Sequence, residues 1–114
     1  MNSPRPGSCA LRRGRVSQQG CIYHVTTCTY LRQMFFGSIS VGRCVVRALR
    51  DAERQQIART LAFVVMPDHL HWLFELQSPS LAAAVGQMKG RAGLVTRIGD
   101  YPLWDCVWVG DRGR

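Results

Sequence analysis

The sequence predicts one α+β domain, in which an antiparallel sheet carries its helices on one face. Two observations predict this class. Segments that alternate between apolar and polar residues are interleaved with segments whose apolar residues recur every three or four positions. The length of 114 residues allows one compact domain, and 46% hydrophobic residues are enough for a core.

Residues 1–20 are expected to form a basic flexible arm, because they are rich in Arg, Gly, Ser, Pro and Gln and have no apolar periodicity. The next segment, CIYHVTTCTY (residues 21–30), predicts a strand, since it is β-branched and aromatic and follows a glycine. Side chains alternate in a strand, so His24 lies on one face with Thr26, and Tyr23 lies on the other.

A turn-like stretch follows, and residues 41–59 predict a helix with apolar residues on one side. Arginines occupy most of its other side, which is typical of a solvated face and also allows a phosphate contact. The apolar run LAFVVM (residues 61–66) predicts a buried central strand. A Pro-Asp step then makes a tight turn into the alternating residues 69–76, which completes a hairpin. Ser80 is expected to cap a second helix that runs to about Gly90.

The order strand, helix, strand, strand, helix is most of a ferredoxin-like layer, an antiparallel sheet with helices on one face. The layer is incomplete, because no fourth strand is assigned within residues 21–90. Residues 91–114 are a C-terminal tail of the same domain, whose apolar end WDCVWV adds an edge strand or packs as a loop. The uncovered face of the sheet is available to bind a ligand.

His69 and His71 are the most informative residues of the sequence. One residue separates them, so both imidazoles stand on one face of their strand, while Leu70 and Trp72 point into the core. Two imidazoles at this spacing suit one divalent cation, and His24 could approach the same face. Histidines on an exposed sheet face often only form hydrogen bonds, which is the alternative. The strongly basic composition favours the metal.

The charge of the chain indicates a polyanionic partner. The formal net charge is +8, the sequence pI is about 10.1, and every one of the 15 basic residues except Lys89 is an arginine. The planar guanidinium fits phosphate oxygens, so nucleic acid is the first partner to consider. The alternative is that the charge only keeps a small protein in solution. The candidate DNA-binding residues are Arg12, Arg13, Arg15, His24, Lys89 and Arg91.

Membrane association is not expected. No segment is long and apolar enough to cross a bilayer, and the N-terminus lacks the apolar core of a signal peptide. We therefore expect a cytoplasmic chain.

Several stretches resemble the REP-associated tyrosine transposases, relatives of the single-tyrosine insertion-sequence transposases and of the HUH endonucleases. They are the arm RRGRVSQQG, the strand IYHVTTCTY, the helix VGRCVVRALRDAE, the hairpin AFVVMPDHLHWLFEL and the tail RAGLVTRIGDYPLWD. The resemblance implies a ferredoxin-like fold, with Mg²⁺ or Mn²⁺ held at His69 and His71. It also implies DNA transposition by cleavage and joining of single-stranded DNA at palindromic hairpins. There a metal polarises the phosphate and a tyrosine attacks it.

The chain departs from the pattern of that family after Gly90. The family carries its tyrosine on a helix downstream of the histidine pair, and an amide residue one turn later completes the metal site. Here the segment RAGLV, which begins at Arg91, follows directly on Met88-Lys89-Gly90, so the tyrosine-bearing region is absent. We interpret this as an internal deletion, either real or produced by gene prediction.

No remaining tyrosine is a convincing nucleophile. Tyr23 and Tyr30 belong to the first strand, and Tyr101 precedes a proline, which makes it only a weak candidate. Two histidines and water form a weak site for a hard cation that prefers oxygen ligands. The sequence thus predicts an impaired DNA-binding protein of the transposase family. The alternatives are a non-catalytic single-stranded DNA binder, a partner that interferes with an intact relative, and a fragment that folds poorly. A homodimer and pairing with an intact relative both stay open.

Overall fold

The computed structural model describes residues 18–95 and 103–111. Its main elements are β1 (Ile22–Thr29), α1 (Ile39–Arg54), β2 (Ala58–Met66), β3 (His69–Leu76), α2 (Leu81–Val95) and β4 (Trp104–Asp111). Two 3-10 turns, η2 (Tyr30–Arg32) and η3 (Phe35–Gly37), connect β1 to α1.

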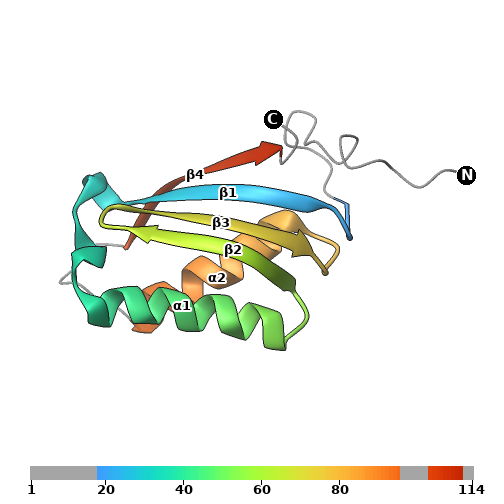
Figure 1. Cartoon of the computed structure of the whole chain (residues 1–114), viewed down its shortest axis with the longest axis horizontal. Coiled ribbons are helices and arrows are strands. Elements are labelled where there is room, and N and C mark those ends of the chain that lie inside the picture. The colour runs from blue at the N-terminus through green and yellow to red at the C-terminus, as the bar shows by residue number, and fades with distance from the viewer. Residues whose placement is uncertain (1–17, 96–102, 112–114) are drawn as a thin grey trace, which may run out of the picture.

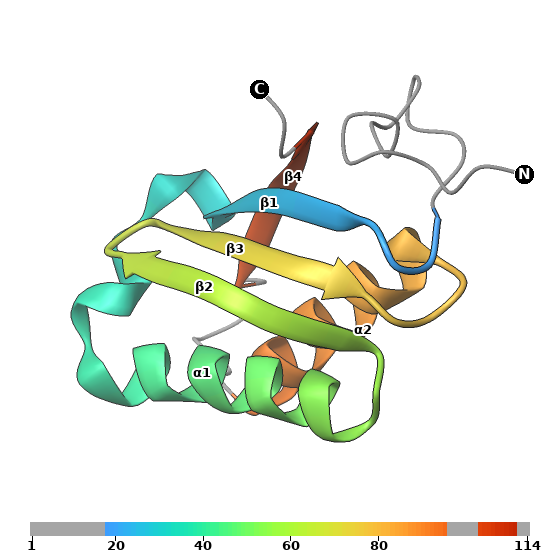
Figure 2. The same ribbon diagram turned by 45° about the vertical axis from the view of Figure 1, so that its right-hand side comes forward.

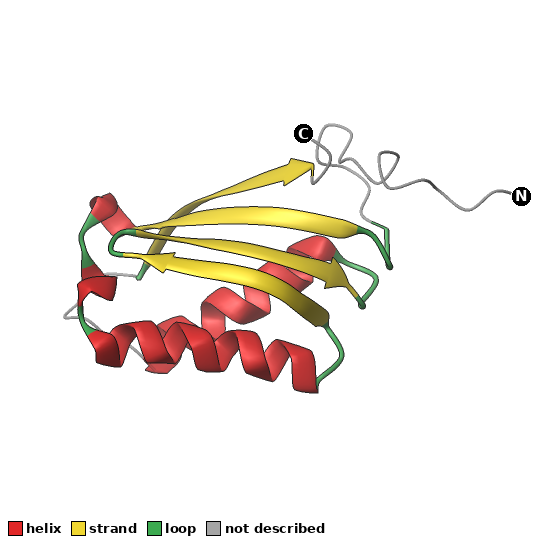
Figure 3. Ribbon diagram, in the orientation of Figure 1, coloured by secondary structure: helices red, strands yellow, loops and turns green. Residues whose placement is uncertain are grey.

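The strands form one antiparallel sheet in the order β2-β3-β1-β4 (Figure 1). Both helices cover the same face of this sheet (Figure 3), and α1 packs beside α2 and under β2 (Figure 2). The predicted ferredoxin-like arrangement is therefore confirmed. The tail supplies β4 next to β1, which completes the strand order that the sequence alone left incomplete.

The core lies between the helices and the inner face of the sheet. Alternation along the two central strands turns Tyr23 of β1 and Trp72 and Phe74 of β3 toward the helices, where all three are buried. The rings of Trp72 and Phe74 stack with their centroids 3.9 Å apart, and Nε1 of Trp72 donates a hydrogen bond to Oγ1 of Thr60 at 2.9 Å. Neither of the two described α-helices covers the opposite face of the sheet (Figure 3).

Helix α1 buries the predicted apolar side, which consists of Val45, Ala48, Leu49 and Ala52. It ends at Arg54, earlier than the predicted residue 59. The chain turns there through Gln56, whose φ of 59° is left-handed. The backbone N–H of Gln56 donates to Glu53 O at 3.0 Å, and that of Ile57 donates to Ala52 O at 2.9 Å. This is the Schellman pattern of helix endings, and it reverses the chain into β2.

Strand β2 lies at the edge of the sheet, so the prediction of a buried central strand at residues 61–66 is wrong. The strand begins at Ala58 and pairs only with β3 among the described strands. Its register shifts between Thr60 and Ala62, which marks a bulge. The exposed large side chains of this strand are Leu61, Phe63, Val64 and Met66. An apolar run is typical of a covered strand, but here one side of the strand has no neighbour among the strands that the structure describes.

Helix α2 begins with the predicted cap, because Oγ of Ser80 accepts a hydrogen bond from the N–H of Ala83 at 3.0 Å. The helix continues to Val95 and does not end near Gly90. The boundary between Gly90 and Arg91, where we expect an internal deletion from the sequence, thus lies inside one helix. In the part of the chain that the structure describes, neither helix has the length and apolar character of a bilayer-spanning segment.

Candidate metal centre and nucleic-acid face

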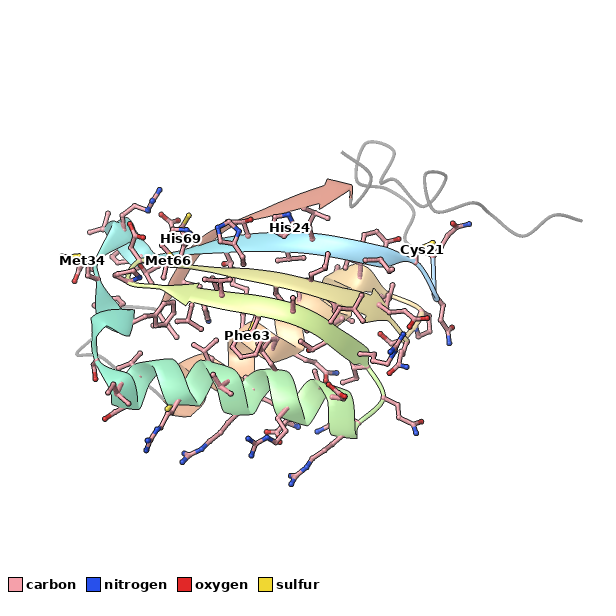
Figure 4. All side chains as sticks on the ribbon, viewed as in Figure 1. Cys21, His24, Met34, Phe63, Met66 and His69 are labelled. Carbon is pink, nitrogen blue, oxygen red and sulfur yellow. The ribbon has the colours of Figure 1, made fainter. Side chains whose placement is uncertain are left out.

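The histidine pair lies on the uncovered face of the sheet, where the alternation of β3 places it. The ring centroids of His69 and His71 are 4.8 Å apart. His24 joins them from the neighbouring strand β1, and its Nε2 is 3.2 Å from Nδ1 of His71. In Figure 4, His24 and His69 stand on the side of the sheet that faces away from α1. The structure therefore gathers all three histidines of the chain into one cluster.

A carboxylate orients the first imidazole of the pair. Nδ1 of His69 lies 2.7 Å from Oδ1 of Asp68, and Nε of Arg32 donates to Oδ2 of the same carboxylate at 3.0 Å. The hydrogen bond with His69 is the main cause that holds the pKa of Asp68 below its usual value, and Arg32 adds to it. With Nδ1 engaged in this way, Nε2 is the nitrogen that His69 has left for a ligand, as in carboxylate–histidine–metal sites.

The turn that carries Asp68 is fixed by the segment after β1. Thr29 is fully buried, and its N–H donates to the carbonyl of Asp68 at 3.0 Å. Oγ1 of Thr29 lies 3.1 Å from that same carbonyl and 2.6 Å from the carbonyl of Gln33. The N–H of Phe36 donates to the carbonyl of Pro67 at 2.9 Å. The backbone carbonyls of both turn residues thus accept hydrogen bonds from the segment after β1. These bonds fix the backbone of Asp68, independently of the contacts of its side chain.

A hydroxyl orients the second imidazole. Strand pairing places Thr26 of β1 opposite His71, and Oγ1 of Thr26 lies 3.1 Å from Nδ1 of His71. When Nδ1–H donates to this hydroxyl, the lone pair of Nε2 is left for a cation. Burial lowers the pKa of His71, and the charges of His69 and His24 lower it further. The ring therefore stays neutral to lower pH, and neutral imidazole is the form that binds metals.

The donor set fits an open cation site with two protein ligands. His69 and His71 each have Nδ1 engaged by a neighbour and Nε2 available. Within residues 18–95 and 103–111, the histidines, cysteines and carboxylates form no group of three or more that could hold a metal ion. The remaining coordination positions of a cation here would have to be filled by water or by oxygens of a bound substrate.

A shallow hollow of about 250 Å³ adjoins His24 and His71 on the same face. Its lining consists of His24, Ala62, Phe63, Val64, His71 and Leu73. Two imidazole rings and a mainly apolar floor are suited to the flat face of a nucleobase, because bases bind proteins by stacking and apolar contact. The hollow thus offers space for a base next to His24 and His71.

Other predicted site residues do not meet at this cluster. Lys89 and Arg91 lie on α2, behind the opposite face of the sheet, and Nη1 of Arg91 forms an ion pair with Asp51 at 3.3 Å. Arg12, Arg13 and Arg15 of the arm and Tyr101 of the tail lie outside the described residues.

Of the two tyrosines in the described part of the chain, one is buried on the other face of the sheet and one follows the end of β1. Tyr23 is 1% exposed on the helix-facing side of β1, and its hydroxyl accepts a hydrogen bond from the N–H of Gln18 at 2.9 Å. Tyr30 lies in η2, beyond the end of β1. Neither stands on an α-helix.

Three residues that help to build the site were not assigned a role from the sequence. They are Thr26, Thr29 and Asp68. Alternation places Thr26 on the same face of its strand as His24, and Asp68 immediately precedes the first histidine of the pair. A role for these two residues could therefore have been predicted from the sequence. Nothing in the sequence indicated that Thr29 would fix the turn, because Asp68 is 39 positions away along the chain.

Comparison with protein families matches residues 17–100 to a family described as "Transposase IS200 like". Among solved structures, one described as the REP-associated tyrosine transposase bound to a REP hairpin matches with a TM-score of 0.68 at 16% identity. The match covers 96% of this chain and 61% of that one. A candidate transposase from Deinococcus radiodurans matches with a TM-score of 0.64 at 23% identity, over 86% of this chain and 83% of that one. These likenesses show a common fold. No curated protein matches.

Proposed function

This chain belongs to the IS200-like transposase family, and we propose that it binds hairpin DNA and holds Mg²⁺ or Mn²⁺ weakly between His69 and His71. The observation that carries the proposal is the pair of oriented imidazoles on the open face. Nδ1 of His69 lies 2.7 Å from a carboxylate oxygen of Asp68, and Nδ1 of His71 lies 3.1 Å from the hydroxyl of Thr26. Partners of this kind direct the other ring nitrogen toward a metal.

A bound cation would supply Lewis acidity to a phosphate oxygen of single-stranded DNA and would orient that phosphate. The protein contributes the rest of the site. Asp68 and Thr26 hold the two imidazoles in place, and the hollow beside His24 takes a base next to the bound phosphate. The net charge of +8 attracts the DNA backbone over the whole molecule. Arg12, Arg13 and Arg15 extend this attraction along the arm.

The proposed partner is a DNA hairpin with single-stranded ends. A structure with the same fold is described as bound to a REP hairpin, which supports this choice. This chain spans 61% of the length of that protein, so the activity of the whole relative does not transfer directly.

We propose further that this chain does not form the covalent phosphotyrosine link. Compared with the pattern of the family, the sequence lacks a tyrosine-bearing segment between Gly90 and Arg91. Of the described tyrosines, Tyr23 is buried on the other face of the sheet and Tyr30 lies in η2, after the end of β1. The candidate that the fold favours is therefore a non-catalytic binder of single-stranded DNA, which could interfere with an intact relative. Two observations support this proposal. Helix α2 runs through this point of the chain, and the strand order is complete, so the face that we propose to bind DNA belongs to a folded sheet.

The test incubates the purified protein with an end-labelled DNA hairpin and manganese and compares native and denaturing gels. We expect a shifted band on the native gel and none on the denaturing gel. His69→Ala should lose the part of the native shift that depends on manganese. Glu75→Gln is the matched control, because Glu75 lies on the same face of β3 and pairs with Arg59 at 2.7 Å.

Either of two outcomes would contradict the proposal. A band that survives denaturation would show that a tyrosine still attacks phosphate, and Tyr101→Phe would then identify it. The absence of a shift on either gel would rule out DNA binding by the isolated chain.

A further inference from the structure

Helix α1 carries a row of four arginines on the side opposite its buried residues. The row consists of Arg43, Arg47, Arg50 and Arg54, and each of them is exposed. Their spacing of four, three and four residues aligns them on one side of a helix. At 1.5 Å per residue, this arginine stripe is about 16 Å long. In Figure 4, nitrogen-tipped side chains project from α1 away from the sheet.

The stripe is only slightly neutralised by nearby carboxylates. Among the described residues, its one ion pair is the contact of Arg54 with Asp51 at 3.8 Å, and Asp51 also pairs with Arg91 at 3.3 Å. The first turn of α1 contains no acidic residue. Like charges three or four residues apart destabilise a helix. A polyanion along this side would relieve that repulsion.

The chemistry of the stripe favours the backbone of a duplex over a single strand. Proteins that bind single strands combine positive charge with aromatic side chains on which bases stack. The sequence of α1, ISVGRCVVRALRDAER, contains no aromatic residue. Phe63 of β2 lines a hollow together with Arg50 and Arg54, but the side chains on the outer side of α1 project away from the sheet (Figure 4). Exposed arginine forks match phosphate contacts, which position a protein on DNA without reading its bases. Double-stranded DNA presents the dense row of phosphates that a straight line of guanidinium groups can contact.

We infer that the arginine stripe of α1 binds the phosphate backbone of double-stranded DNA. The inference rests on the proposed function for the choice of DNA as the partner, but it concerns a different surface. The histidines occupy the uncovered face of the sheet, and α1 lies behind the other face, under the edge strand β2. One molecule thereby offers two DNA sites, with a single strand at the histidines and a duplex stem at α1. A hairpin that passes around the edge of β2 can occupy both.

The test measures the affinity of the full chain for a short blunt-ended DNA duplex by fluorescence anisotropy at several salt concentrations. Each lost phosphate contact should reduce the slope of log K against log salt by about 0.9. Arg47→Gln should therefore reduce the slope by about 0.9, and Arg47→Gln combined with Arg50→Gln by about 1.8. Arg59→Gln is the matched control. It removes the same charge from β2, where Arg59 pairs with Glu75, and should leave the slope unchanged.

Three outcomes would overturn the inference. One is an unchanged slope in the double variant while circular dichroism shows an intact fold. Another is an equal loss in Arg59→Gln, which would mean diffuse attraction by net charge. The third is polyglutamate binding to the stripe as tightly as the duplex, which would make it a surface for an acidic protein.

Failure of this inference can be told apart from failure of the proposed function. His69→Ala should keep full affinity for the blunt duplex, because His69 lies on the other face of the sheet. The double variant of the stripe should in turn keep the manganese-dependent shift of hairpin DNA. If one of the two assays contradicts its expectation and the other does not, only the statement about the corresponding site is wrong.

Discussion

At the residue scale, Asp68 connects the hairpin turn to the histidine pair. One carboxylate oxygen lies 2.7 Å from Nδ1 of His69, and the other accepts a hydrogen bond from Arg32. Its backbone carbonyl accepts a hydrogen bond from the N–H of Thr29. Leu31 and Arg32 have left-handed φ values of 56° and 54°, which turn the chain sharply after β1. The placement of the first metal ligand thus depends on a segment that lies far away in sequence.

We expect Asp68→Asn to weaken manganese binding by about 10- to 100-fold, because loss of the partner of a ligating histidine typically has this effect. His69→Ala should abolish the binding altogether. Isothermal titration with manganese measures both. Glu75→Gln should bind as the wild type does. Unchanged manganese binding in His69→Ala would contradict the assignment of His69 as a metal ligand. If instead only Asp68→Asn binds manganese like the wild type, the proposed role of the carboxylate is wrong and the metal assignment stands.

The residues of the site could be predicted from the sequence only where alternation along one strand decided the matter. The period of two placed His69 and His71 together and left His24 able to join them, and the structure agrees. Lys89 and Arg91 show the limit. Both residues follow the histidine pair in sequence. Which face of a sheet a helix covers depends on how the chain crosses the sheet, and this cannot be seen from the residues themselves. In the structure, Lys89 and Arg91 lie on α2, away from the histidines.

At the element scale, the end of α1 depends on one strained residue. Gln56 adopts a φ of 59°, which favours glycine, and the hydrogen bonds of the Schellman pattern hold it there. The sequence extended the helix to residue 59 because the usual signal, a glycine after the last turn, is absent. The periodic pattern gives no other sign of where the helix ends.

Gln56→Gly should stabilise the protein by about 1 kcal/mol, because glycine removes the steric cost of the left-handed conformation. The free energy of unfolding in urea measures the change. Gln55→Gly is the control. Its φ of −87° suits any residue, so glycine there should bring no gain and only the entropic cost of a more flexible chain. Equal effects at both positions would contradict the account of the turn.

The hairpin shows which features of an element its own sequence determines. Residues 69–76 were predicted with the bounds that β3 has in the structure, because one face of that strand is buried and the other is not, so apolar and polar residues alternate along it. β2 was predicted as central and lies at the edge. An apolar run indicates that a strand is hydrophobic, but its place in the sheet is decided by the connections of the other strands.

At the scale of the whole molecule, one core joins the sheet to both helices. Trp72 lies in this core with no exposed surface, where its ring stacks on Phe74 and its Nε1 donates a hydrogen bond to Thr60. Trp72→Ala should cost about 3–5 kcal/mol, which is a large share of the roughly 5–15 kcal/mol that stabilises a typical domain. Urea unfolding followed by circular dichroism should show the transition at much lower denaturant. Trp72→Phe, which keeps most of the ring volume, should lose clearly less.

A loss in Trp72→Ala as small as that of a surface substitution would mean that this core is not well packed and would favour the poorly folding fragment. The fold class and the open face that carries the histidines were predictable, because they follow from the order of elements. The tail was not, since WDCVWV suits both a strand and a packed loop, and pairing with β1 decides between them.

The bulge in β2 also affects how the protein behaves in a crowded solution. An open strand edge with exposed Phe63, Val64 and Met66 can serve as a template for the strand of another molecule, which is how sheet proteins begin to aggregate. The register shift between Thr60 and Ala62 interrupts the regular ladder along that edge. An irregular edge is a poor template, so this one extra residue helps to keep newly made chains apart until each has found its own fold.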